Sequence, residues 1–198
     1  MRSIGLDFDN TLVDYTEVFR AEAAALGVET AGLDKTEIRD RLRARGAEGE
    51  IAWQKVQARV YGPGLARAPM MAGSAAFLAR SAAAGARLAV ISHKGRFAAQ
   101  DPGGTDLREA ARLWLGRHCP VVPADRIFFE DERAGKLRVI GTLGLTHFID
   151  DLPEVLDDPA FPPGVARLWL VERAGAVCLP GMLAAGAWPV LARAVFGE

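Results

Sequence analysis

Short apolar runs recur along the chain, and the later ones are separated by segments with helical periodicity. The runs lack the polar alternation of half-exposed strands, so each is predicted to be a strand that is buried on both faces of a parallel sheet. Alternating strands and helices imply right-handed strand–helix–strand units. We expect strands at residues 3–6, 87–91, 126–129, 146–149 and 167–171, and helices at 73–84, 106–118 and 135–143.

The segment between the first two predicted strands is different, because it has helical character over most of its length. Helices are expected at residues 16–26, 34–45 and 51–61. Asp34, with Glu37 three residues later, predicts a capping-box start for the second of these helices. This is too much helix for one crossover, so we expect a small helical cap of residues 14–69, inserted into a core of residues 1–13 and 70–198.

Two aspartates follow the first predicted strand. Asp7 and Asp9 are two residues apart, so their side chains project toward the same side of the sheet. Neighbouring carboxylates repel each other, and a divalent cation is the simplest way to keep both ionised. Thr11 adds a hydroxyl that can donate to a bound anion. The pattern predicts a Mg²⁺ site where open α/β sheets place their ligands, and the alternative is an Asx-rich turn that closes the strand.

A second acidic pair strengthens the metal hypothesis. Asp150 and Asp151 follow the apolar run at residues 146–149, so two strands would each deliver paired carboxylates to their carboxyl ends. Together the two pairs predict a metal pocket more specifically than either pair does alone. Asp151 also has a structural alternative as the N-cap of a helix that begins at Leu152, and the two roles are compatible.

Four short motifs follow one another along the chain: Asp7-x-Asp9-x-Thr11, Ser92, Lys136 and Asp150-Asp151. In this order they resemble the motifs of the haloacid dehalogenase-like (HAD) superfamily. The resemblance extends from residue 2 to about residue 172, and it implies an α/β fold class: a Rossmann-like parallel sheet with helices on both faces and a small helical cap inserted after the first strand. The segments at residues 91–94 and 148–154 are similar to a bacterial subgroup.

The resemblance implies an enzyme of the phosphoric monoester hydrolase class. Asp7 is the candidate nucleophile, which would form an aspartyl-phosphate intermediate. Asp9 stands where the family has its general acid and base, and its presence favours phosphoryl transfer because the family's dehalogenases lack it. Mg²⁺ would be bound by Asp7, the backbone carbonyl of Asp9 and Asp150, with Asp151 as a further or indirect ligand.

Phosphate binding is expected at the end of the second strand and at the third motif. Ser92 would donate its hydroxyl to a phosphoryl oxygen, helped by the backbone N–H of the neighbouring His93. Lys136 would neutralise charge on the phosphorylated Asp7, although Lys94 competes for this role. Lys94 or Arg96 is also a candidate for contacting a second anionic group on the substrate; the alternative is that both belong to a solvated basic loop.

Composition narrows the classes of partner. The 198 residues include 24 Lys and Arg against 25 Asp and Glu, so we expect no nucleic-acid or membrane partner. Cys119 and Cys178 form no metal or redox motif, which makes a reducing compartment the default. The chain enters its first strand directly, leaving no room for a signal peptide, and no apolar stretch reaches the length of a membrane span. A cytoplasmic protein is expected.

The sequence therefore predicts a Mg²⁺-dependent phosphatase that acts on a small phosphorylated metabolite. One alternative is a phosphotransferase or mutase that uses the same aspartyl-phosphate intermediate. Another is a non-catalytic regulatory module that keeps the phosphate pocket, although the intact set of Asp7, Asp9, Lys136 and Asp150 weighs against it. The natural substrate and the oligomeric state do not follow from the sequence.

Overall fold

A computed structural model describes residues 1–171 and 180–197 of the chain. Cys178 lies outside the described residues, and Cys119 is buried with a free thiol. Among the residues that the structure describes, no helix is both long enough and apolar enough to cross a membrane.

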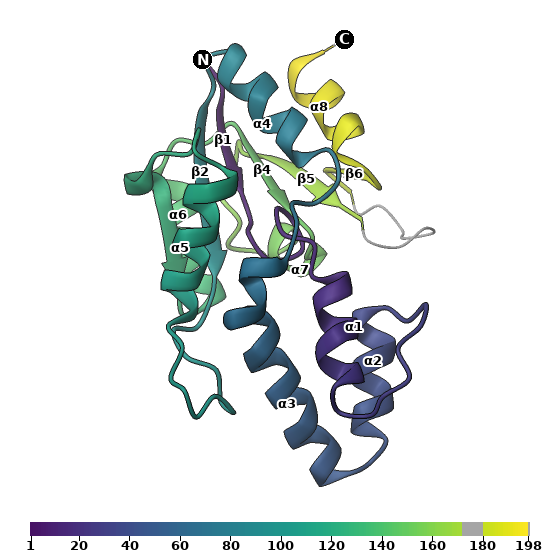
Figure 1. The fold of residues 1–198 in the computed structure, drawn as a ribbon. Helices are drawn as coiled ribbons and strands as arrows, with labels where there is room; N and C mark the ends of the chain where they lie inside the picture. The colour runs from purple at the N-terminus through teal and green to yellow at the C-terminus, as the bar shows by residue number, and fades with distance from the viewer. Residues whose placement is uncertain (172–179, 198) are drawn as a thin grey trace. The chain divides into compact units, whose positions relative to one another are not determined.

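A six-stranded parallel sheet forms the centre of the fold, as expected from the apolar runs (Figure 1). Every neighbouring pair of strands is parallel, which confirms the predicted α/β class. The last strand was not expected from the sequence. In spatial order the strands are β3 (Ile127–Glu130), β2 (Arg87–His93), β1 (Ser3–Leu6), β4 (His147–Asp150), β5 (Ala166–Leu170) and β6 (Met182–Ala185).

The strand order changes direction between β1 and β4. The chain builds outward from β1 through β2 to β3, and then crosses to the other side of β1 to add β4, β5 and β6. Open α/β sheets bind ligands at such a switch in direction, outside the carboxyl ends of the strands. Leu6 pairs with Ile149, and the backbone N–H of Asp7 donates to the Ile149 carbonyl at 2.9 Å. The two strands therefore end side by side.

Helices cover both faces of the sheet. α6 (Arg133–Thr142) and α7 (Pro153–Leu156) contribute to a buried apolar cluster with Ala89 of β2 and Phe148 of β4. Leu88 and Val90, which alternate with Ala89 along β2, are also buried, so neither face is open. α4 (Ser74–Ala83) and α8 (Trp188–Phe196) lie side by side (Figure 1), with α4 against β2 and α8 against β5 and β6.

The chain divides into two compact units. The first, called here the sheet unit, comprises Met1–Val13, Met70–Lys94 and Leu115–Glu198; the second, called the helical unit, comprises Asp14–Pro69 and Gly95–Trp114. The boundary between the units falls within α5 (Leu107–His118), because Trp114 belongs to the helical unit and Leu115 to the sheet unit. The assignment of these parts to a catalytic core and a cap stays a prediction.

The helical unit is built on α1 (Thr16–Ala24), α2 (Lys35–Arg43) and α3 (Ala47–Tyr61), followed by a 3₁₀ turn at Pro63–Arg67. Phe19 of α1 stacks on Trp53 of α3 with ring centroids 5.5 Å apart, so aromatic packing joins these helices. The Asp34 side chain accepts the Glu37 N–H, and the Glu37 carboxylate accepts the Asp34 N–H. This capping box is the one predicted from the sequence.

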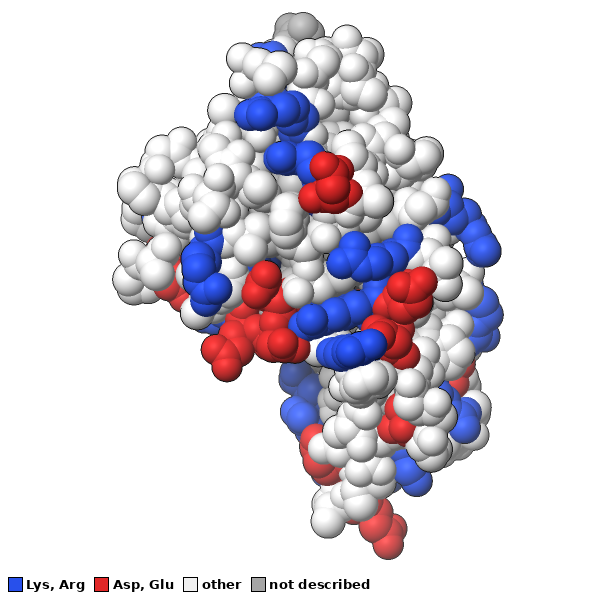
Figure 2. All heavy atoms as spheres, turned by 90° about the vertical axis from the view of Figure 1, so that its left-hand side faces the viewer, with Lys and Arg blue, Asp and Glu red and all other residues white. Residues whose placement is uncertain are grey.

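The surface carries both signs of charge. On the face drawn in Figure 2, basic and acidic side chains are interspersed, as expected from the nearly equal numbers of the two kinds in the sequence.

Candidate active site

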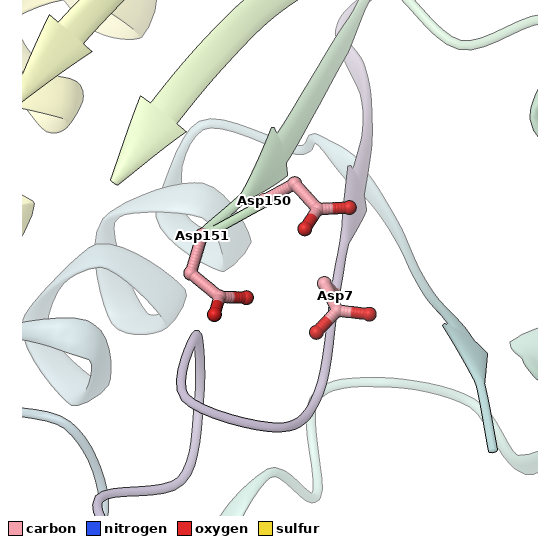
Figure 3. Close-up of side chains that lie close together, drawn as sticks. All are labelled: Asp7, Asp150 and Asp151. Carbon is pink, nitrogen blue, oxygen red and sulfur yellow. The ribbon is translucent and has the colours of Figure 1, made fainter. Parts of the chain in front are cut away.

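Three carboxylates gather where β1 and β4 end. Asp7 follows β1, Asp150 is the last residue of β4, and Asp151 comes next (Figure 3). One carboxylate oxygen from each lies within 4.8 Å of the others, and the three residues are only 5 %, 0 % and 8 % exposed, respectively. Buried carboxylates this close together repel one another, so the group requires a compensating positive charge.

Lys136 supplies one such charge from α6. Its Nζ donates to Asp7 Oδ1 at 2.6 Å and to Asp150 Oδ2 at 2.7 Å, and the residue is 1 % exposed. Burial alone would lower the pKa of Lys136, but the adjacent Asp7 and Asp150 carboxylates outweigh burial and raise the pKa above its ordinary value. Lys136 is therefore a fixed cation that bridges the ends of β1 and β4.

Lys136 does not fully compensate the acidic group. Burial raises the pKa of Asp7 to about 7, and the charge of Asp150 adds to this effect while Lys136 opposes it. The Asp9 carboxylate also contributes to the increase, so its charge acts on the same site. The ionised form of Asp7 is therefore disfavoured in the folded protein, and a second cation beside it would stabilise that form.

The donor set fits a hard divalent cation. Mg²⁺ prefers oxygen ligands and usually keeps some of its waters, so a few carboxylates with space for water and substrate suffice. The outer hydrogen bonds hold these carboxylates in place: Asp150 Oδ1 accepts the backbone N–H of Leu152 at 3.0 Å, and Asp151 Oδ1 accepts the Thr11 hydroxyl at 3.1 Å. The residues that could hold the ion are Asp7, Asp150 and Asp151, together with the backbone carbonyl of Asp9.

Asp9 is directed toward a different lysine. Lys94, which directly follows β2, donates from Nζ to both Asp9 oxygens, at 3.0 and 2.9 Å. The Asp9 side chain is 23 % exposed, whereas that of Lys94 is 4 % exposed. The two predicted lysines therefore have separate partners, because Lys136 binds Asp7 and Asp150 while Lys94 binds Asp9.

Thr11 lies in the loop after β1, and its hydroxyl donates to Asp151. Asn10, the residue before it, adopts a left-handed backbone conformation with φ of 58° and directs its amide toward the other oxygen of Asp151 at 3.5 Å. This loop therefore fixes the Asp151 carboxylate. The N-cap of α7 is Leu152, with no side-chain cap, so the helix-capping alternative for Asp151 is wrong.

The remaining candidates are distributed between the two units. Ser92 is buried near the end of β2, and His93 is the last residue of that strand. Burial lowers the pKa of His93, and the charges of Lys136 and Arg133 lower it further, which places the imidazole in the field of the site. Arg96 belongs to the helical unit, where its Nε donates to Asp106 at 2.7 Å.

Three contributors were not expected from the sequence. The Trp169 indole N–H donates to the backbone carbonyl of Asp151 at 3.0 Å, and the Trp188 indole N–H donates to that of Thr11 at 3.3 Å. Asn10 is the third, through its contact with Asp151. Trp169 and Trp188 carry no local sequence signal, because they reach the site loops from β5 and α8. The identity of Asn10 offered a weak signal, because asparagine tolerates a left-handed conformation.

This arrangement suits the transfer of an anionic group. The Asp7 carboxylate lies just after β1, Lys136 holds positive charge beside it, and the three carboxylates can bind a divalent cation. Asp9 supplies a second, partly exposed carboxylate that can exchange protons. Phosphoryl transfer requires a nucleophile, fixed positive charges and a proton-transfer group.

The sequence matches no family model and no curated protein. Solved structures are nevertheless similar over nearly the whole chain. A haloacid dehalogenase-like family hydrolase from Xanthomonas campestris has 19 % identity and a TM-score of 0.57, covering 98 % of this chain and 96 % of that one. A HAD family hydrolase from Deinococcus radiodurans, solved with bound phosphate and sodium, has 14 % identity and a TM-score of 0.60, covering 98 % and 95 %.

The HAD-hydrolase YfnB from Bacillus subtilis, solved with magnesium, is a third similar structure. It has 12 % identity and a TM-score of 0.60, and the match covers 100 % of this chain and 99 % of that chain. At these identities the likeness concerns the fold, and the chemistry must be argued from the residues described above.

Proposed function

The chain has the haloacid dehalogenase-like fold, and from that premise we propose that it is a Mg²⁺-dependent phosphatase acting on a small phosphorylated metabolite in the cytoplasm. The observation that carries this proposal is the buried cluster of Asp7, Asp150 and Asp151 with Lys136 across it. The cluster combines a nucleophile, a cation site and a fixed positive charge at the switch point of the sheet. Two of the similar structures support it further, since one was solved with phosphate and another with magnesium.

The first half-reaction transfers the phosphoryl group to Asp7. A carboxylate oxygen of Asp7 forms a bond to phosphorus while the bond from phosphorus to the alcohol oxygen breaks. Protonated Asp9 gives its proton to the departing alcohol oxygen. Lys136 stabilises the negative charge that gathers on the phosphoryl oxygens, and its position is set before the reaction begins.

The second half-reaction releases phosphate. Asp9, now ionised, takes a proton from water as the water oxygen bonds to phosphorus and the bond to Asp7 breaks. Asp7 and protonated Asp9 are restored, so the sum of the two steps is hydrolysis of the phosphomonoester. Ser92 and the backbone N–H of His93 are proposed to bind phosphoryl oxygens at the end of β2.

When bound, Mg²⁺ would neutralise charge on the substrate and on the carboxylates that hold it. Asp7, Asp150 and the Asp9 carbonyl are the proposed ligands, with Asp151 adjacent. Asp151 is oriented by Thr11 and Asn10, so these two residues would act on the cation through it.

Hydrolysis of p-nitrophenyl phosphate with and without Mg²⁺ tests this proposal. We expect turnover that requires the cation and that Asp7→Asn reduces to below about a hundredth of wild type, because the amide is a poor nucleophile. Asp125→Asn, at an exposed position of the 3₁₀ turn Ala124–Arg126, is the matched control and should retain full activity. Activity of Asp7→Asn at the wild-type level would overturn the proposal.

A phosphotransferase with the same intermediate is the alternative enzyme. It differs only in the acceptor, since an alcohol replaces water in the second half-reaction. A screen of phosphorylated metabolites with and without added alcohols would separate the two, because a transferase yields a new phosphate ester in place of free phosphate. A non-catalytic module would bind phosphate and turn over none of these substrates.

A further inference from the structure

The site contains a second buried lysine that the proposed reaction does not use. Lys94 contacts both oxygens of Asp9 from the residue directly after β2, the strand on the opposite side of β1 from β4. Lys136 contacts neither oxygen of Asp9 among its described hydrogen bonds, which go to Asp7 and Asp150. Each aspartate of the first motif thus has its own lysine.

Lys94 is held firmly in this position. Its backbone N–H donates to the Glu130 carbonyl at 2.8 Å, which extends the pairing of β2 with β3. Its Nζ lies 5.3 Å from the centroid of the Phe8 ring, a distance at which a cation is attracted to the ring face. A lysine with a side chain only 4 % exposed needs an anionic partner, and Asp9 provides it.

The contact with Lys94 orients the Asp9 carboxylate. The Asp9 side chain is partly exposed, and the Lys94 Nζ contacts both of its oxygens. A donor that engages both oxygens fixes the side-chain torsions and the plane of the carboxylate. Proton transfer depends strongly on such placement, because an error of about 1 Å can cost on the order of a hundredfold in rate.

We propose that Lys94 is a positioning residue that holds Asp9 in the orientation needed for proton transfer, and that it acts on the reaction through Asp9. The proposal rests on the proposed phosphatase function. When Asp9 carries the proton destined for the leaving oxygen, that proton occupies one carboxylate oxygen and Lys94 donates to the other. After the proton has passed to the alcohol, the bidentate pair seen in the structure forms again.

If Lys94 acts through Asp9, the loss of kcat/KM on replacing Lys94 should depend on the leaving group of the substrate. An alkyl phosphate releases a poorly stabilised alkoxide unless Asp9 protonates it, whereas p-nitrophenyl phosphate releases a phenolate that hardly needs the proton. Loss of Lys94 should therefore lower kcat/KM for an alkyl phosphate much more than for p-nitrophenyl phosphate. A lysine that bound the phosphoryl group directly would affect both substrates equally.

The experiment compares Lys94→Met, Lys94→Gln and Lys94→Arg in the full chain with glycerol phosphate and p-nitrophenyl phosphate as substrates. Lys55→Met, at an exposed position on α3, is the matched control for removing a lysine. Lys94→Gln keeps one donor for Asp9 and serves if Lys94→Met does not fold. Competitive inhibition by inorganic phosphate provides a readout of anion binding that does not depend on the leaving group.

We expect Lys94→Met and Lys94→Gln to lower kcat/KM for glycerol phosphate by about tenfold or more and that for p-nitrophenyl phosphate by less than about threefold. The inhibition constant of phosphate should not change, and Lys94→Arg should recover most of the loss. In an Asp9→Asn background, Lys94→Gln should cause no further decrease, because its effect passes through Asp9.

Equal losses on both substrates together with weaker phosphate inhibition would overturn the proposal, since they would place Lys94 on the phosphoryl group. Unchanged kinetics in Lys94→Gln, combined with a leaving-group-dependent loss in Asp9→Asn, would refute the role of Lys94 alone. If Asp7→Asn and Asp9→Asn both retain wild-type activity, the proposed function itself fails.

Discussion

Each acidic side chain of the site has a partner that is distant in sequence. The Lys136–Asp7 contact joins residues 129 positions apart, and the Lys94–Asp9 contact joins residues 85 positions apart. Motif order indicated which residue types gather at the strand ends, and it favoured Lys136 for the role beside Asp7. The assignment of Lys94 to Asp9 did not follow from it, because that pairing depends on how β2 lies against β1.

The charge on Asp7 should limit the stability of the metal-free protein. Burial raises the pKa of folded Asp7 from 3.8 to about 7, so between these values the folded state holds a proton that the unfolded chain has lost. The free energy of unfolding therefore decreases as the pH rises through this window, by an amount on the order of a few kcal/mol. Asp7→Asn lacks this dependence.

Thermal unfolding of both proteins in chelator at pH 5, 6, 7 and 8 measures the effect. Subtracting the two curves removes the contributions of the histidines, which titrate in the same range. The melting temperature of Asp7→Asn should rise relative to wild type as the pH increases. A constant difference, or a relative gain by wild type, would contradict a raised pKa at Asp7.

Most elements formed where the apolar and helical patterns predicted them, and the failures have physical causes. β6 (Met182–Ala185) contains none of the β-branched and aromatic residues that identify strands, and a glycine flanks it on each side. α8 begins at Trp188 with Pro189 in its first turn, and no helix was expected there from the sequence. Proline suits the first turn of a helix, because the N–H it lacks has no partner there.

Close packing between β1 and β4 brings Asp7 and Asp150 together, and Gly5 makes it possible. A Cβ at Gly5 would lie 2.6 Å from both Leu145 Cδ1 and Phe148 Cδ2. Gly5→Val should therefore lower the free energy of unfolding by about 1–3 kcal/mol through overpacking. Denaturant titration measures the change.

Gly116→Ala is the control for this substitution. Gly116 lies in α5, and a Cβ there would meet no atom within 4 Å, so alanine should leave stability unchanged or increase it by about 0.5–1 kcal/mol. If Gly5→Val matched wild type in stability, the close approach of the two strands would not be the constraint described here.

For the whole molecule, the sequence predicted a parallel α/β sheet but not the order of its strands. That order places the ends of β1 and β4 side by side, and it is set by contacts between residues far apart in the chain. Helical periodicity likewise indicated the helices of residues 14–69, but not that residues 95–114 group with them in one compact unit. Residues 95–106 have no periodic pattern, and the helical pattern of α5 does not reveal which unit its residues join.

Removal of the metal should stop the reaction without unfolding the chain. The carboxylates lie at the carboxyl edge of the sheet, outside the cluster of buried apolar side chains, so we expect folding not to depend on the ion. A circular dichroism melt in excess chelator should stay cooperative, while p-nitrophenyl phosphate turnover disappears and returns with added Mg²⁺. Collapse of the melt on chelation would indicate a structural metal.

In the proposed reaction, Asp7 carries the phosphoryl group during turnover. Acid quenching during steady-state hydrolysis, followed by mass spectrometry of the peptide that contains Asp7, tests this most directly. We predict a phosphoryl adduct on Asp7 that hydroxylamine removes and that is absent from Asp7→Asn. Rapid turnover with an adduct on another residue, or with no adduct while fluoroberyllate and Mg²⁺ fail to inhibit, would contradict it.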